Sequence, residues 1–135
     1  MNSNPAAARA EPLILIDTSS WIHMLRPSGD PAVRDRVQAA LASGQACWCP
    51  LVQLELWNGA RGDHEQKVLR HFAEVLPELP MDEEVWSSAF DLARRARSHG
   101  VTVPTTDLMI AACARRHGVT LETADSDFEL LQQVR

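Results

Sequence analysis

The stretch LILIDTSSW, residues 13–21, decides the fold class of this chain. Its first four residues are apolar at every position, which is typical of a central parallel strand covered by helices on both faces. Asp17 ends this apolar run and is followed by three hydroxyl side chains, those of Thr18, Ser19 and Ser20. We expect Asp17 either to cap a helix that begins at residue 18 or to form one wall of a charged site at the end of the strand.

Outward from this stretch, apolar segments alternate with helical patterns. Strands are expected within 45–50 and 119–123, and the prolines of 75–81 confine any strand there to an edge or a loop. The segments with a helical pattern are 18–29, 30–44, 50–62, 63–76, 82–100, 105–118 and 126–133, the last of which opens with the capping-box spacing Ser126–Glu129. Because no internal repeat or linker interrupts it, this alternation predicts a single α/β sandwich around a parallel sheet.

The composition is that of one globular domain. The chain has 135 residues, of which 45% are apolar and 23% are charged. No segment reaches the roughly 18 consecutive apolar residues of a membrane span, and residues 1–12 are interpreted as a mobile leader rather than a signal peptide. We therefore expect a cytoplasmic protein without membrane contact. The three cysteines, an odd number without a paired Cys/His pattern, are interpreted as buried thiols.

Four acidic residues stand out from the patterns around them. Asp17 and Asp125 follow expected strands, and parallel strands end at the same rim of a sheet. Asp107 comes directly before the apolar run LMIAA, and Glu55 shares its helix face with apolar neighbours one turn away. The aspartates, together with Asp127, also have an ordinary explanation as helix caps or turn residues. Glu55, inside a short helix, has no such capping role.

Together these residues predict a metal site at the rim of the sheet. Carboxylates about 4 Å apart repel each other by roughly 4 kcal/mol at an effective dielectric constant of about 20, so a fold that crowds them gains something from it. Oxygen ligands without His or Cys favour Mg²⁺ or Mn²⁺, which promote phosphodiester hydrolysis. The hydroxyls of Thr18, Ser19 and Thr106 are expected to hold the carboxylates or a phosphate.

Four segments carry a resemblance to a known family: LIDTSSWI (15–22), PLVQLELWNGA (50–60), TTDLMIAACARRHG (105–118) and LETADSDFELL (121–131). In this order, they resemble the motifs of PIN-domain ribonucleases, and most of all those of the VapC-like toxins of bacterial type II toxin–antitoxin pairs. The resemblance covers almost the whole chain after the leader. It implies a PIN domain at 13–135, a three-layer sandwich in which helices flank a mostly parallel sheet of four to five strands.

The resemblance also implies a site and its partners. The family's four acids match Asp17, Glu55, Asp107 and Asp125, Asp127 is a further candidate ligand, and hydroxyl positions beside the first and fourth acids match Thr18 and Thr123. Family membership implies cleavage of RNA (tRNA, rRNA or mRNA) that depends on Mg²⁺ or Mn²⁺. It further implies a homodimer and a small, VapB-like antitoxin that blocks the site. Arg61, directly after the second motif, is expected to contact an RNA phosphate.

Two other functions stay open at this point. A phosphotransfer or phosphatase domain would use Asp17 as its nucleophile, but it would want a second aspartate where Ser19 stands, or a lysine beside the site. The only lysine is Lys67, inside a helical segment. A catalytically weak PIN scaffold would act only through a protein partner, although the full set of acids argues against it. The net charge of −5 opposes extensive binding of nucleic acid but leaves room for a small, metal-dependent site.

Overall fold

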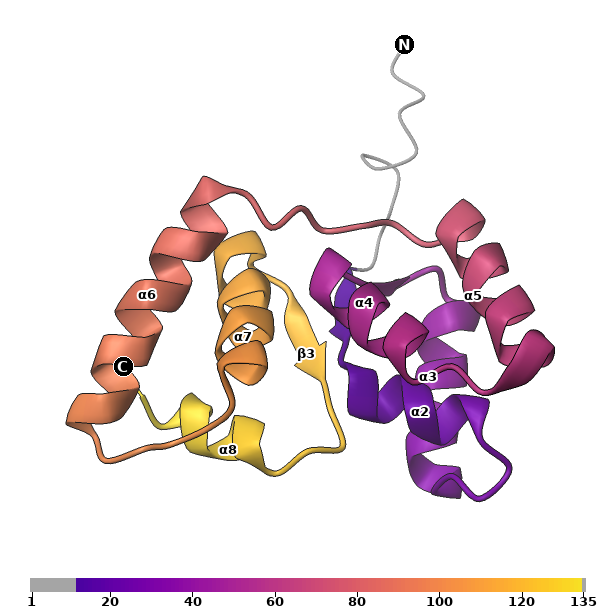
Figure 1. Ribbon diagram of the computed structural model, residues 1–135, viewed down its shortest axis with the longest axis horizontal. Coiled ribbons are helices and arrows are strands. Elements are labelled where there is room, and N and C mark those ends of the chain that lie inside the picture. The colour runs from indigo at the N-terminus through magenta and orange to yellow at the C-terminus, as the bar shows by residue number, and fades with distance from the viewer. Residues whose placement is uncertain (1–11, 135) are drawn as a thin grey trace, which may run out of the picture.

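The computed structural model describes residues 12–134, so the leader expected at 1–12 lies outside the described residues except for Pro12. Within this range, three strands alternate with helices (Figure 1). The strands are β1 (Ile14–Ile16), β2 (Ala46–Cys47) and β3 (Thr120–Glu122). The helices are α2 (Thr18–Leu25), α3 (Pro31–Ala42), α4 (Pro50–Asn58), α5 (Gly62–Val75), α6 (Glu83–Ser98), α7 (Thr105–His117) and α8 (Asp127–Gln132).

The sheet is parallel, and β1 is its central strand. Leu15 of β1 lies opposite Cys47 of β2 on one side and Leu121 of β3 on the other, which gives the strand order β2–β1–β3. Leu15 and Ile16 are fully buried, as the apolar run predicts. Figure 1 shows α2 to α5 gathered in one half of the molecule and α6 to α8 in the other, with β3 between them. The predicted α/β architecture, with helices flanking a parallel sheet, is therefore confirmed.

The sheet has fewer strands than the four to five expected. In the described part of the chain, the segment 75–81 contributes only an isolated parallel bridge between Trp48 and Glu78. The Trp48 N–H donates to the Pro77 carbonyl at 3.2 Å, and the Trp48 carbonyl accepts from the Leu79 N–H at 2.8 Å. Because Pro77 and Pro80 have no N–H, they cannot donate to a longer ladder, and this segment stays an edge contact.

Two helix ends show how local chemistry sets the boundaries. α7 ends at His117 and is capped by Gly118, whose φ of 65° lies in the left-handed region that favours glycine. The capping box expected at Ser126–Glu129 does not form, because the Ser126 side chain makes no capping hydrogen bond. The Asp125 carboxylate instead accepts from the Asp127 N–H at 2.9 Å and orders the start of α8. The capping-box prediction is therefore wrong.

Aromatic side chains tie the helices of one layer to the sheet. The ring of Phe72 in α5 lies 4.9 Å from that of Trp21 in α2 and 6.1 Å from that of Trp48, the residue after β2. Both tryptophans are buried, and so are the three cysteines, as predicted. Over residues 12–134, no helix combines the length and apolar character that crossing a membrane requires.

Candidate metal centre

The acids predicted to share a rim of the sheet lie at the carboxyl ends of β1 and β3. Asp17 directly follows β1, and its N–H donates to the Glu122 carbonyl at 2.9 Å, which continues the pairing of the two strands to their last residues. Asp125 lies in the loop after β3, and Asp107 lies in the first turn of α7. Neighbouring parallel strands therefore bring residues from distant parts of the sequence to one edge, as the strand pattern predicts.

The buried carboxylate of Asp17 is held by hydroxyl groups and does not cap α2. Its Oδ2 accepts from Ser19 Oγ at 2.6 Å and from Thr123 Oγ1 at 2.8 Å, while the α2 cap has no side-chain hydrogen bond. The same hydroxyls accept from the loop after β3: Thr123 Oγ1 from the Asp125 N–H at 2.9 Å, and Ser19 Oγ from the Ala124 N–H at 3.0 Å. Asp17 and the Asp125 loop are thus fixed as one unit.

Asp107 is a buried carboxylate without enough hydrogen bonds. It is 8% exposed, and its Oδ2 has no hydrogen-bond partner among the described residues. Leaving a buried polar atom unpaired usually costs about 1–3 kcal/mol. One carboxylate oxygen from each of Asp107, Asp125 and Asp127 lies within 4.8 Å of the other two, so the Asp107 carboxylate stands in a cluster of like charge. A cation bound among them would satisfy it.

The electrostatics of Asp107 reflect this crowding. Burial and, in decreasing order of effect, the charges of Asp125, Asp17, Asp127 and Glu55 together raise the pKa of Asp107 from 3.8 to about 7. The other four acids proposed from the sequence therefore all act on Asp107 in the fold. With a pKa of about 7, Asp107 is partly protonated at neutral pH, so the metal-free site holds less negative charge than its formal count suggests.

Glu55 is outside the three-acid cluster, and its charge is the weakest of the four that raise the pKa of Asp107. It lies in α4, half-buried, and its Oε1 accepts from Thr18 Oγ1 at 2.7 Å. Thr18 is the first residue of α2, so this bond links the start of α2 to the face of α4 that looks toward the rim. The hydroxyl expected beside the first acid thus serves the helix glutamate.

Two predicted site residues make no side-chain bond to the acids. Thr106 precedes Asp107 in α7, and within the described residues its hydroxyl holds neither a carboxylate nor another partner. Arg61 is exposed just before α5, and its N–H donates to Glu65 Oε1 at 2.7 Å. The buried Glu65 is in turn paired with Arg26 at 2.8 Å, so this segment is anchored while the Arg61 side chain remains outside.

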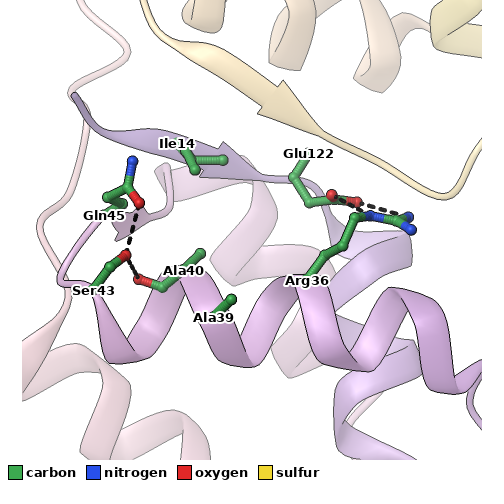
Figure 2. A pocket seen from close by; sticks show the side chains of 7 residues that line it. All are labelled: Ile14, Arg36, Ala39, Ala40, Ser43, Gln45 and Glu122. Atoms are coloured by element: carbon green, nitrogen blue, oxygen red, sulfur yellow. Dashed lines mark hydrogen bonds and ion pairs between the residues drawn. The ribbon is translucent and has the colours of Figure 1, made fainter. Parts of the chain in front are cut away.

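Glu122 is a supporting residue that sequence reasoning missed. Its Oε2 accepts from Ser20 Oγ at 2.9 Å and its Oε1 from Arg36 Nε at 2.8 Å, which ties β3 to α2 and α3. Figure 2 shows this ion pair, with Ile14 and Ala39 nearby. These residues line a hollow with a volume of about 420 Å³. Glu122 lies opposite Ile16 in the parallel pairing of β3 with β1. Side chains alternate between the two faces of a strand, and that of Glu122 lies on the face covered by α3.

A comparison with known families identifies the family of this chain. The sequence profile of the PIN domain matches residues 14–133 of this chain. The chain belongs to the PIN-domain family. Among PIN-domain proteins it is similar to ribonuclease VapC11 from Mycobacterium tuberculosis and to VapC ribonuclease Mb1587 from Mycobacterium bovis. Each is 32% identical to it over an alignment of 125 residues, and the match covers 90% of this chain and 93% of the relative.

Solved structures share this PIN fold. FitAcB from Neisseria gonorrhoeae has a TM-score of 0.68 and 22% identity over 89% of this chain and 94% of that chain. The DNA-bound VapBC from Salmonella typhimurium has a TM-score of 0.72 and 21% identity over 93% of this chain and 96% of that chain. At such identities the likeness is one of fold.

Proposed function

We propose that this PIN-domain protein is an endoribonuclease that requires a divalent metal ion and acts as the toxin of a type II toxin–antitoxin pair. One observation carries the proposal: the buried Asp107 carboxylate has an oxygen without a partner and lies in a cluster with the carboxylates of Asp125 and Asp127. The relatives named as VapC ribonucleases, and the neighbours solved as FitAcB and VapBC, support this reading.

The residues at the rim fit a hard cation. Their donors are carboxylate oxygens, without a thiolate or imidazole, which is the set that Mg²⁺ and Mn²⁺ prefer. In the proposal, Asp17, Glu55, Asp107 and Asp125 are the metal-ligand and catalytic acids, and Asp127 is a further ligand. When bound, the ion supplies Lewis-acid stabilisation of the scissile phosphate and a more acidic water.

Hydroxyl side chains of this chain hold two of these acids in place in the absence of a metal ion. Ser19 and Thr123 hold one oxygen of Asp17 and leave the other available, and Thr18 does the same for Glu55. Such outer hydrogen bonds usually change metal affinity or activity by roughly 10- to 100-fold. The exposed Arg61 side chain is proposed to contact an RNA phosphate, a contact that positions the strand without reading its sequence.

The partners in the proposal are an RNA substrate, a VapB-like antitoxin and a second copy of this chain, with residues 13–135 as the PIN domain. The phosphotransfer alternative is not favoured. The hydroxyl of Ser19, where that chemistry would place a second aspartate, donates to Asp17, and Lys67 is exposed on α5.

Cleavage of RNA by the purified chain tests the proposal. Wild type is expected to cleave RNA in the presence of Mg²⁺ or Mn²⁺ and to become inactive in excess chelator. The Asp107→Asn variant should cleave RNA at least 100-fold more slowly than wild type. Asp35→Asn is the matched control, since Asp35 is an exposed acid on α3. Cleavage that persists in chelator, or an Asp107→Asn variant as active as Asp35→Asn, would refute the assignment.

A further inference from the structure

The three-acid cluster of the candidate metal centre is shared between two helices that contact each other. Asp107 lies in the first turn of α7, and Asp127 is the first residue of α8, two positions after Asp125. Hydroxyl groups fix the backbone of the Asp125 loop. Because Asp127 belongs to α8, its position beside Asp107 depends in addition on how α8 lies against α7.

α8 is too short to keep this position by itself. It spans six residues, Asp127–Gln132, and isolated helices shorter than about 12–15 residues are marginal in water. Phe128 and Leu131 are buried, but a hollow of about 150 Å³ remains between them and Ala111 and Ala114 of α7. Atoms that border a void lose packing contacts, so apolar packing alone attaches α8 weakly.

Arg115 of α7 holds the other end of α8. Its Nη2 donates to the Leu131 carbonyl at 2.7 Å, and its Nη1 donates to the Val134 carbonyl at 3.4 Å. A positive charge is favourable at this end of a helix, where arginine can bond the last carbonyls. Within residues 12–134, no other helix makes a hydrogen bond to this end of α8. α8 is therefore attached to α7 by a guanidinium at one end and carries an acid of the cluster at the other.

We propose that Arg115 is a positioning residue for the metal centre: it holds the end of α8 on α7 and thereby keeps Asp127 beside Asp107. This inference rests on the proposed function, since it assumes that both carboxylates contact one cation. Such an ion binds well only while α8 lies against α7, so the ion and the guanidinium favour the same position of α8. The two attachments are then coupled, and the loss of one weakens the other.

The sign of the effect separates positioning from simple electrostatics. Removing the positive charge of Arg115 would by itself strengthen the binding of a cation. If Arg115 positions Asp127, however, its replacement by glutamine should weaken that binding. Arg116 offers the matched control, because this exposed neighbour makes its ion pair with Glu84 of α6.

Hydrogen–deuterium exchange and Mn²⁺ titration of the full chain test the proposal. In chelator, the amides of 128–134 should exchange roughly tenfold faster in Arg115→Gln than in wild type, because hydrogen bonds to a charged group are lost. Mn²⁺ should slow this exchange in wild type. The Kd for Mn²⁺, measured without RNA by electron paramagnetic resonance, should rise roughly tenfold in Arg115→Gln. Arg116→Gln should match wild type in both measurements, and Arg115→Lys, which keeps a charged donor, should lie between. Thermal unfolding checks that each variant is folded.

A double variant shows whether Arg115 acts through Asp127. Asp127→Asn should weaken Mn²⁺ binding, and adding Arg115→Gln should weaken it little further. The inference would be overturned by equal exchange of 128–134 in Arg115→Gln and wild type, by Mn²⁺ binding that is unchanged or tighter in Arg115→Gln, or by additive effects in the double variant. A wild type that binds Mn²⁺ without cleaving RNA would refute the proposed ribonuclease and leave the role of Arg115 intact, whereas a wild type that binds no Mn²⁺ would refute both.

Discussion

Replacing Asp107 by asparagine should stabilise the metal-free protein at neutral pH. The pKa of Asp107 is raised from 3.8 to about 7 by burial and by neighbouring carboxylates. A raised native pKa means that the unfolded chain releases this proton before the folded chain does. Stability is therefore full below about pH 4 and falls as the pH rises toward 7. Asparagine has the shape of the protonated acid and never ionises, so the variant should lose this pH dependence.

The size of the effect follows from the pKa. A difference of about 3 units corresponds to an upper limit of about 4 kcal/mol at 1.36 kcal/mol per unit. Water and mobile ions reach the rim of the sheet and screen part of the repulsion, so we expect roughly 1–2 kcal/mol. For a domain of this size that gain corresponds to a rise in Tm of roughly 4–10 °C.

Thermal unfolding in chelator at pH 4 and pH 8 measures this gain. Asp107→Asn should unfold above wild type at pH 8 and close to it at pH 4. Adding Mg²⁺ or Mn²⁺ should then raise the Tm of wild type and leave that of the variant almost unchanged. Asp35→Asn should follow wild type throughout. If Asp107→Asn were less stable than wild type at pH 8 in chelator, the carboxylate would be a structural group and the argument from crowding would fail.

Three further outcomes follow from other contacts. Thr18→Val removes the hydroxyl that holds Glu55 and should slow cleavage by roughly tenfold with little change in Tm, while Thr18→Ser keeps the rate. Arg26 holds the pKa of Glu65 below its usual range, so this pair stabilises the fold at neutral pH and is lost as the pH falls through the lowered pKa. Urea unfolding should therefore show Glu65→Ala less stable by roughly 3 kcal/mol at pH 7, with a smaller difference near pH 3. Gly118→Ala, at a φ of 65°, should cost about 1 kcal/mol in the same assay.

The positions of the acids could be predicted because each follows from a backbone rule. An all-apolar strand that stops at Asp17, and a later strand that stops just before Asp125, predict a shared rim once the sheet is parallel. Glu55 could be found because a charge on the apolar face of a helix has no simple structural explanation. These inferences need only periodicity and topology, which a single sequence contains.

The hydrogen bonds between the side chains could not be predicted in the same way. Thr18 and Ser19 are adjacent, yet one serves Glu55 and the other serves Asp17. This choice depends on the rotation of α2 against α4 and β3, which local patterns do not contain. The capping box at Ser126 failed for a related reason, since Asp125 competes for the same helix start and its position is set by β3.

The acids differ in how well their carboxylates are hydrogen-bonded, and this difference is the strongest physical argument for a bound cation. Asp17 accepts two hydroxyl hydrogen bonds, and Glu55 accepts one, so part of the cost of burying them is offset inside the chain. Asp107 is buried with one oxygen unpaired and with like charges around it. If stability alone mattered, asparagine or a hydroxyl residue would be better at position 107, because either would remove the repulsion between carboxylates and could donate a hydrogen bond. The aspartate is explained if the protein works with a positive ion beside it, and the stability gained by Asp107→Asn in chelator measures what that ion must offset.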